Sequence, residues 1–330
     1  MRAIQVVNEG KDARLVLGEA PEPKPGPREV AIAVCATAVN RADLLQRRGL
    51  YPPPPGASPI LGLECAGRID ELGSEVRGFE RGERVMALLA GGGYAERVCV
   101  DAGSLMRIPE RLDFAHAAAV PEVFLTCDLN LFQIAGARAG EHVLVHGGGS
   151  GIGTTAIQLL RQQGARVIVT CGSDAKAERC LELGAERAIN YREQEFAPAV
   201  LEHTDGQGVH VVLDSIGAAY LEPNVRCLRT GGRLVLIGTM GGSRGEIDLA
   251  WLLRKRLTVV GSTLRGRSVE EKASITRAFV ERFGEALASG AVAPVVDEVL
   301  PLAEAQRAHE RLERSDHFGK LVLRVEDQND

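Results

Sequence analysis

The stretch that decides the fold is HVLVHGGGSGIGTTAIQLL, residues 142–160. An apolar run leads into a cluster of glycines, and an apolar helical pattern starts directly after it. Glycine permits a tight turn and removes the Cβ atoms that would keep a phosphate from the backbone. The amides at the start of the helix would then face a pyrophosphate, which the helix dipole also favours. The residues predicted to lie against these phosphates are Ser150, Gly151, Ile152 and Gly153.

The glycine spacing departs from the usual dinucleotide fingerprint. If Gly148 and Gly153 are the outer positions of G-x-G-x-x-G, the middle position is Ser150. A glycine-rich turn that binds nothing therefore remains an alternative. The sequence that follows favours binding, because the fingerprint carries most weight inside a series of strand–helix units.

Strands and helical patterns alternate from residue 142 onward, and about six strands fit between 142 and 262. This alternation predicts an α/β fold, with a doubly wound parallel sheet covered by helices on both faces. The first third of the chain differs, because it reads as short strands with a Pro/Gly-rich loop at 49–62. The last segment resembles this β-rich part, so we expect the chain to return to it and the parallel-sheet domain to be an insertion.

The end of the second strand of that sheet bears on cofactor choice. After ARVIVTC, residues 165–171, the chain continues with Gly172 and Ser173, where a carboxylate for a free ribose 2′-hydroxyl is usual. Ser173 can donate to a phosphate and Lys176 adds positive charge, so the sequence favours NADPH. Tyr191, at the end of the third strand, is predicted to bound the same pocket. The alternatives are a solvated lysine and an ordinary strand-end tyrosine.

Composition narrows the classes of function. The chain has 330 residues, of which 45% are hydrophobic and 25% charged, and the formal charge is −5. These values are ordinary for a globular protein and argue against disorder, a fibre, or a surface for nucleic acid or membranes. We see no signal peptide or membrane span, and the seven cysteines include no C-x-x-C pair. A cytoplasmic protein is expected.

Several motifs in order, among them NRADLLQRRG, YPPPPGASPILGLECAG, HGGGSGIGTTAIQL and TCGSDAKAE, resemble the zinc-free quinone oxidoreductases. These belong to the medium-chain dehydrogenase/reductase superfamily, and the subgroup most similar is that of the tumour-suppressor-inducible quinone oxidoreductase. The resemblance implies a GroES-like catalytic domain at 1–120, completed by 263–330. It also implies a Rossmann NADPH-binding domain at 121–262. A homodimer joined through the edge strand LTVVGS, 257–262, is expected, with a tetramer left open.

Zinc-dependent relatives carry metal ligands where this chain has other residues. The resemblance places Asn40 and Leu63 at a cysteine and a histidine of those relatives, and Glu122 at a third ligand. Asparagine and leucine do not replace a thiolate and an imidazole in a tetrahedral site. We therefore expect no metal site, and the spacing of the histidines suggests none either.

The activity implied is NADPH-dependent reduction of quinones by hydride transfer, without a metal. The resemblance gives Asn40 and Tyr51 as catalytic residues that also line the cofactor site. The other residues expected to close over the cofactor are Thr126, Ile216, Gly217, Gly238, Met240, Gly241, Leu264, Arg265, Phe318, Gly319 and Lys320. The alternatives are a 2-alkenal or enoyl reductase on the same scaffold and an NADPH-binding sensor with little turnover. A small-molecule quinone or enone is thus the expected partner.

Overall fold

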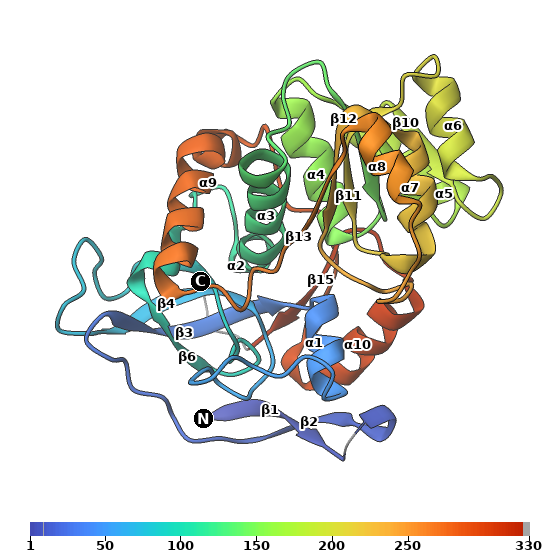
Figure 1. The fold of residues 1–330 in the computed structure, drawn as a ribbon. Coiled ribbons are helices and arrows are strands. Elements are labelled where there is room, and N and C mark those ends of the chain that lie inside the picture. The colour runs from blue at the N-terminus through green and yellow to red at the C-terminus, as the bar shows by residue number, and fades with distance from the viewer. Residues whose placement is uncertain (9, 326–330) are drawn as a thin grey trace. The chain divides into compact units, whose positions relative to one another are not determined.

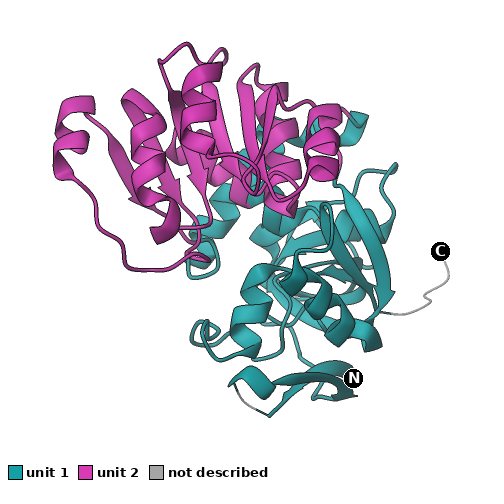
Figure 2. Ribbon diagram, turned by 90° about the vertical axis from the view of Figure 1, so that its right-hand side faces the viewer, with its two compact units in different colours: residues 1–125, 264–290, 294–330 teal, residues 126–263, 291–293 magenta. Residues whose placement is uncertain are grey.

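The computed structural model describes residues 1–8 and 10–325, and the chain forms two compact units (Figures 1 and 2). Unit 1 comprises Met1–Leu125, Leu264–Gly290 and the segment from Pro294 to the end of the described chain. Unit 2 comprises Thr126–Thr263 and Ala291–Ala293. Each unit is described by itself below.

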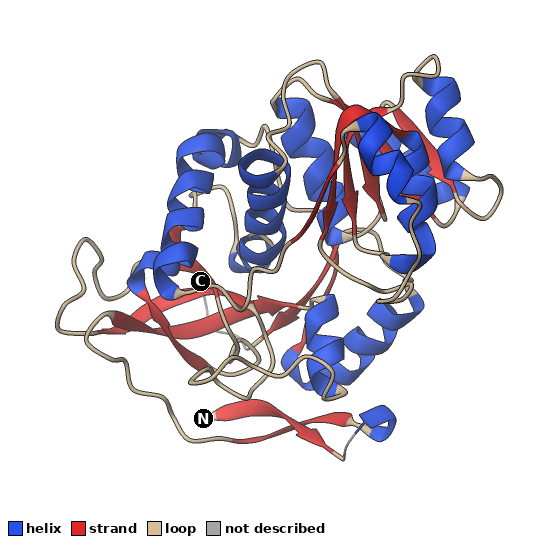
Figure 3. Cartoon of the chain, in the orientation of Figure 1, coloured by secondary structure: helices blue, strands red, loops and turns tan. Residues whose placement is uncertain are grey.

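Unit 2 is built on a parallel sheet, whose strands are red in Figure 3. The strand order is β10-β9-β8-β11-β12-β13. In order along the chain this is 3-2-1-4-5-6, the order of a dinucleotide-binding Rossmann sheet. The predicted α/β class and the number of strands are therefore confirmed. The strands are β8 (His142–His146), β9 (Arg166–Cys171), β10 (Arg187–Asn190), β11 (Val209–Asp214), β12 (Leu228–Leu236) and β13 (Thr258–Gly261).

The helices of unit 2 follow the strands, as a doubly wound sheet requires. Their apolar residues pack on the sheet around a core that includes Leu144, Ile168, Phe196 and Val212. The helices are α4 (Gly151–Gln162), α5 (Asp174–Leu183), α6 (Phe196–His203), α7 (Leu221–Cys227) and α8 (Leu249–Lys255). Helix α3 (Pro121–Cys127) begins in unit 1 and ends in unit 2.

Unit 1 is mostly antiparallel sheet. Its larger sheet has the order β14-β15-β3-β4-β5-β7, and β6 also pairs with β3. Residues at alternate positions of β3, such as Val30, Ile32 and Val34, are buried in the core of this unit. The strands are β1 (Arg2–Val7), β2 (Arg14–Glu19), β3 (Glu29–Ala38), β4 (Glu64–Leu72), β5 (Arg84–Leu88), β6 (Arg97–Asp101), β7 (Leu105–Arg107), β14 (Val296–Pro301) and β15 (Lys320–Arg324).

Four helices of unit 1 are α1 (Arg41–Arg47), α2 (Phe114–Ala118), α9 (Val269–Ser289) and α10 (Ala305–Arg314). Helix α9 starts at a capping box, in which Ser268 Oγ accepts from Glu271 N and the Glu271 carboxylate accepts from Ser268 N. It ends before Gly290, whose φ is +84°. Phe279 of α9 packs edge-on against Phe124, with ring centroids 5.9 Å apart.

The return of the chain to unit 1 has one detail that the sequence did not predict. The short segment Ala291–Ala293 belongs to unit 2, although the chain on both sides of it belongs to unit 1. The Gln158 side chain of α4 explains this, because it donates to Ala293 O (2.8 Å) and accepts from Ala293 N (2.9 Å). The expected segment 263–330 extends to residues 326–330, which lie outside the described residues.

Within residues 1–8 and 10–325, no helix combines the length and the apolarity needed to cross a membrane.

Candidate functional site

The glycine turn of unit 2 connects β8 to α4. Ser150 is the N-cap of α4, where its Oγ accepts from Gly153 N (3.0 Å) and donates to Gly147 O (2.7 Å). A Cβ on Gly153 would lie 2.3 Å from Gly147 O, so no side chain fits at this position. Gly147 itself has a φ of +76°. The turn is therefore fixed by glycines and by one serine hydroxyl.

The start of α4 fits a diphosphate. The amides of Gly151 and Ile152 are in the first turn of the helix, where no intrahelical acceptor is available. Together with the positive end of the helix dipole, free amides of this kind can bind an anion. All four residues predicted to contact the phosphates thus lie in one turn of backbone.

A polar network lies under this turn and connects three strand ends. His146 Nδ1 is 3.0 Å from Thr170 Oγ1, and His146 Nε2 is 2.7 Å from Asn224 Oδ1. Asn224 Nδ2 in turn donates to Asp214 Oδ2 (3.0 Å). Burial lowers the pKa of His146 to about 4, so the ring is neutral at pH 7 and one nitrogen donates while the other accepts. We infer that this network supports the turn rather than binding a ligand.

Two further loops of unit 2 lie where β11 and β12 end. The Asp214 carboxylate accepts from Ile216 N (2.6 Å) and Gly217 N (3.1 Å), and burial raises its pKa. Gly241 N donates to Ile216 O (2.7 Å), which joins the two loops. Five residues expected to contact the cofactor lie in these loops: Ile216, Gly217, Gly238, Met240 and Gly241.

The end of β9 brings together the residues predicted for a 2′-phosphate. A Cβ on Gly172 would lie 2.6 Å from Tyr191 Oη, so the second and third strand ends are in close contact here. Ser173 is the N-cap of α5 and accepts from Lys176 N (3.3 Å). Tyr191 is 44% exposed and Lys176 is half-buried. The carboxylate of Asp174 accepts a hydrogen bond from Asn190 Nδ2 (2.9 Å).

Arg192 is a residue of this region that sequence reasoning missed. It is exposed, and its Nε lies 3.7 Å from the position of a Cβ on Gly172. It directly follows Tyr191 at the end of the third strand, which is a signal that the sequence did contain. A guanidinium here offers planar donors to a phosphate.

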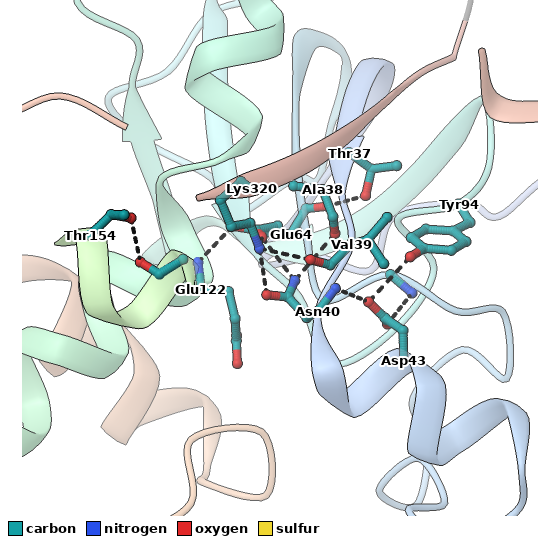
Figure 4. Close-up of polar contacts among 12 residues, drawn as sticks. Thr37, Ala38, Val39, Asn40, Asp43, Glu64, Tyr94, Glu122, Thr154 and Lys320 are labelled. Carbon is teal, nitrogen blue, oxygen red and sulfur yellow. Dashed lines mark hydrogen bonds and ion pairs between the residues drawn. The ribbon is translucent and has the colours of Figure 1, made fainter. Parts of the chain in front are cut away.

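A buried polar cluster in unit 1 surrounds Asn40 (Figure 4). The Lys320 ammonium donates to Asn40 Oδ1 (2.6 Å), Glu64 Oε1 (2.8 Å) and Val39 O (3.0 Å). Asn40 Nδ2 donates to the same Glu64 Oε1 (2.8 Å) and to Ala38 O (3.2 Å). Lys320 is 4% exposed and Glu64 is fully buried. All three ammonium hydrogens are used inside the protein, which gives Lys320 the role of holding Asn40 and Glu64.

The cluster leaves Asn40 with one specific capacity. Both of its amide hydrogens are donated and Oδ1 accepts from Lys320, so one lone pair of Oδ1 remains. The Asn40 side chain can therefore accept one more hydrogen bond, as from a hydroxyl of a ligand, but it has no donor left.

The resemblance to zinc-dependent relatives raises the question of a catalytic zinc ion at Asn40. The residues at this place do not fit one. Leu63 is buried and has no ligand atom. A positively charged ammonium lies 2.6 Å from Asn40 Oδ1, where it would repel a metal ion. Asn40, Leu63 and Glu122 therefore do not form a tetrahedral site of thiolate and imidazole ligands.

Asp43 continues the polar cluster away from Asn40. Asp43 Oδ2 accepts from Asn40 N (2.8 Å), and Oδ1 accepts from Gly62 N (3.1 Å). Burial raises the pKa of Asp43 to about 6. Tyr94 Oη lies 3.3 Å from Asp43 Oδ2 and 3.1 Å from His309 Nε2, in the core of unit 1. Asp43 thus fixes the start of α1.

Glu122 has a raised pKa, as a proton donor needs. It is half-buried, and burial followed by the nearby Glu64 carboxylate raises its pKa to about 8. Its own amide donates to Glu64 Oε2 (2.8 Å). A carboxyl group with this pKa keeps its proton at pH 7. No local sequence pattern indicates this shift, because it comes from burial in the tertiary fold and, next, from Glu64, which is 58 residues away.

Tyr51 and Arg265 form a pair in unit 1. The Arg265 guanidinium lies 5.3 Å from the centroid of the Tyr51 ring, and its Nη1 donates to Tyr51 O (3.2 Å). Arg265 also donates to Gln46 Oε1 (2.7 Å) and Ala90 O (2.8 Å), so it ties α1 to two loops. Burial raises the pKa of Tyr51, with a smaller contribution from Glu122.

The remaining predicted residues lie at several places. Leu264 and Phe318 are buried in unit 1, and Phe318 N donates to Asp297 Oδ1 (3.2 Å). Gly319 has a φ of +95°, and a Cβ there would lie 2.2 Å from Val295 O. Thr126 is half-buried at the start of unit 2, and its carbonyl accepts from Asn130 Nδ2 (2.8 Å).

Comparison with known proteins agrees with this architecture. Residues 26–110 match the family described as alcohol dehydrogenase GroES-like domain, and residues 151–279 match that described as zinc-binding dehydrogenase. A quinone oxidoreductase of Rattus norvegicus is 32% identical over 329 residues, which cover 98% of this chain and 97% of that protein.

Solved structures show the same likeness. The quinone oxidoreductase of Escherichia coli complexed with NADPH has a TM-score of 0.86 and 32% identity, and the match covers 98% of this chain and 99% of that one. The CurK enoyl reductase also has a TM-score of 0.86, with 27% identity and 98% of each chain covered. The chain belongs to the medium-chain dehydrogenase/reductase superfamily, with quinone oxidoreductases among its relatives.

Proposed function

We propose that this protein is an NADPH-dependent oxidoreductase that reduces quinones without a metal. The observation that carries the proposal is the Lys320 ammonium, which is bound to Asn40 and Glu64 where zinc-dependent relatives are expected to hold their metal. Without a Lewis acid to stabilise an alkoxide, the suitable acceptors are those that delocalise the arriving charge themselves. Quinones and conjugated enones meet this requirement.

The choice of NADPH rests on unit 2 and on two similar structures. The quinone oxidoreductase of Escherichia coli and a mycobacterial protein with 30% identity were both solved with NADPH. In this chain Gly172 and Ser173 follow β9 where a carboxylate is usual, and Lys176 and Arg192 supply positive charge in the same region. We propose that Ser173, Lys176, Tyr191 and Arg192 bind the 2′-phosphate, while the turn at 150–153 binds the diphosphate.

The reduced nicotinamide supplies the hydride when it is bound. We propose that Asn40 accepts a hydrogen bond from the ribose through its remaining lone pair, and that the ring of Tyr51 packs at the nicotinamide end. Thr126, the loops at 214–217 and 237–242, and Leu264 are proposed to line the rest of the cofactor. Arg265, Phe318 and Lys320 would support this lining, because their polar groups are bonded within unit 1, and Gly319 would support it through its close approach to Val295.

Glu122 is proposed as the source of the proton. A quinone that accepts a hydride becomes a hydroquinone anion, and one proton completes the neutral hydroquinone. A carboxyl group that is still protonated at pH 7 can give that proton and recover it from water.

The test is consumption of NADPH by the purified protein with 1,4-benzoquinone and 1,4-naphthoquinone, followed by the absorbance of the reduced cofactor. We expect turnover with at least one of them. Absence of turnover with every quinone, together with binding of NADPH in a titration, would favour the sensor with little turnover.

Enoyl reduction is the second candidate, because it is favoured by a specific likeness. Besides the CurK enoyl reductase, a polyketide synthase subunit of Mycobacterium tuberculosis is 30% identical over 324 residues, which are 15% of that protein. Comparison of kcat/KM for quinones, 2-alkenals and enoyl thioesters separates the two activities. The class with the highest value identifies the acceptor.

We also propose that the protein forms a homodimer through β13. This strand is the last in the sheet order of the described chain and pairs with β12 along one edge, and its Val259 is 39% exposed. Pairing with a second copy would satisfy its backbone groups. Light scattering of the wild type and of Val259→Pro tests this, and a dimer that persists in the variant would point to another interface.

A further inference from the structure

Three side chains with metal-ligand chemistry meet at the amino-terminal edge of the unit 2 sheet. His142 is the first residue of β8, Glu186 directly precedes β10, and His203 is the last residue of α6. Each offers one ligand atom, and these three atoms lie within 4.8 Å of one another. The residues are 17 to 61 positions apart in the sequence, so their spacing gave no sign of the group.

We propose that His142, Glu186 and His203 bind a divalent transition metal ion, with Zn²⁺ as the fitting ion. Two imidazoles and one carboxylate are ligands that Zn²⁺ takes readily, with a water molecule completing four coordination. Ligand atoms in a tetrahedral zinc site are about 3.3 Å apart, given Zn–N bonds of about 2.0 Å. His203 Nε2 is already 3.3 Å from Glu186 Oε1.

The nitrogen atoms of the two rings support this proposal. The Nε2 atom of His142 is buried and has no hydrogen-bond partner among the described residues, and the buried Nε2 atom of His203 lies at ion-pair distance from Glu186 without a hydrogen bond. The two rings meet edge to face, with centroids 6.2 Å apart. A buried polar nitrogen without a partner costs free energy, and coordination of a metal would remove this cost.

The neighbours of the three side chains would form an outer shell. Arg166 Nε donates to Glu186 Oε2 (2.8 Å), and Arg166 Nη2 contacts Glu186 Oε1. In the proposed site Oε1 turns to the metal while Arg166 keeps Oε2, which is a usual outer-shell arrangement. His210 Nδ1 accepts from the backbone amide of His142 (3.0 Å) and so fixes the start of β8.

This site is separate from the proposed nucleotide site. Strand β8 runs from His142 to His146, and the glycine turn follows its far end. Five strand residues span roughly 13 Å. Metal binding would join β8, α6 and the segment before β10, so its expected effect is on the stability of unit 2.

The test uses the full chain, freed of metal with a chelator, and Zn²⁺ alone. We expect one Zn²⁺ per chain in competition with a chromophoric chelator, and a rise in melting temperature on adding Zn²⁺. His142→Asn and His203→Asn should each weaken binding at least tenfold and abolish that rise. His116→Asn is the matched control, because His116 is exposed and bonded to Asp113.

A second measurement keeps the proposal testable if either variant fails to fold. Diethyl pyrocarbonate modifies unprotected histidines, and mass spectrometry locates them. Zn²⁺ should protect His142 and His203 of the wild type and leave His116 equally reactive. Stoichiometric binding with no protection of these two residues, affinity unchanged in both variants, or no binding of Zn²⁺ by the wild type would each overturn the proposal.

Discussion

The glycine turn of unit 2 and the cluster around Asn40 in unit 1 are built in opposite ways. The turn uses backbone amides from a few consecutive residues, and one side-chain hydroxyl fixes it. The cluster uses one amide and two charged side chains, which are 24, 256 and 280 residues apart along the chain. The first site depends on the absence of Cβ atoms, whereas the second depends on the balance of one buried positive and one buried negative charge.

The largest loss of stability is expected when one of the two buried charges of the cluster, Lys320 or Glu64, is removed. Lys320→Met leaves the fully buried Glu64 carboxylate without its cation. We expect a loss of about 3–5 kcal/mol in the free energy of unfolding, measured with urea, because an unpaired buried charge is strongly destabilising. The exposed Lys24→Met serves as a control.

The double variant Glu64→Gln/Lys320→Met sharpens this prediction. It removes both charges, so it should recover much of the stability that Lys320→Met loses. If the double variant is as unstable as the single one, the loss comes from packing, and the charge balance is not what holds the cluster.

One added methyl group in the glycine turn should lower the stability of the protein and weaken its binding of NADPH. Gly153→Ala places a Cβ 2.3 Å from Gly147 O, and we expect a loss of stability of about 1–3 kcal/mol from overpacking. NADPH binding, followed by the fluorescence of the reduced cofactor, should weaken in the same variant because the amides of the turn shift. Gly266→Ala is the matched control, since a Cβ there meets no atom within 4 Å. Unchanged NADPH binding in Gly153→Ala would place the cofactor elsewhere.

The contrast between the turn and the cluster also explains how much of each the sequence could predict. The turn, the missing carboxylate after β9 and the alternating strands are local patterns, and the structure has all of them. The role of Lys320 is not local, because its three acceptors lie just after β3 and at the start of β4, in a distant part of the chain. The pKa of Glu122 and the meeting of His142 with His203 likewise depend on the tertiary fold. Motifs therefore indicated the glycine turn of unit 2, and tertiary geometry was needed for the cluster of unit 1.

The proposed preference for NADPH depends on side chains of unit 2 that follow β9 and β10. Lys176→Ala and Arg192→Ala should each weaken NADPH binding about tenfold or more, since a charge-assisted hydrogen bond is worth about 1.5–3 kcal/mol. NADH binding should change little, because it has no 2′-phosphate. Arg187→Ala, at the opposite end of β10, is the control. Equal losses for both cofactors would show that these residues do not bind the 2′-phosphate.

The smallest expected effect is the pH dependence of the unfolding free energy that comes from the proton on Glu122. Because the folded state raises its pKa from the ordinary value near 4.5 to about 8, the protonated form is the one that folding favours. The stability linked to Glu122 is therefore complete below pH 4.5 and is lost as the pH rises to 8. Glu122→Gln has no proton to lose, so its stability relative to the wild type should increase between pH 5 and 8. We expect a gain of about 1 kcal/mol, since solvent screens a half-buried group.

Urea unfolding of both proteins at a series of pH values measures this difference. Asp43, whose pKa is about 6, titrates in both proteins, and the subtraction removes its contribution. A difference that stays constant over this range would mean that Glu122 is ionised at pH 7 and cannot serve as the proton donor. If the difference does rise, the rate of quinone reduction by the wild type should fall above pH 8, because the donor is then deprotonated. The same rate in Glu122→Gln should be lower at pH 7 and nearly independent of pH across that step, which separates a proton donor from a residue that only stabilises unit 1.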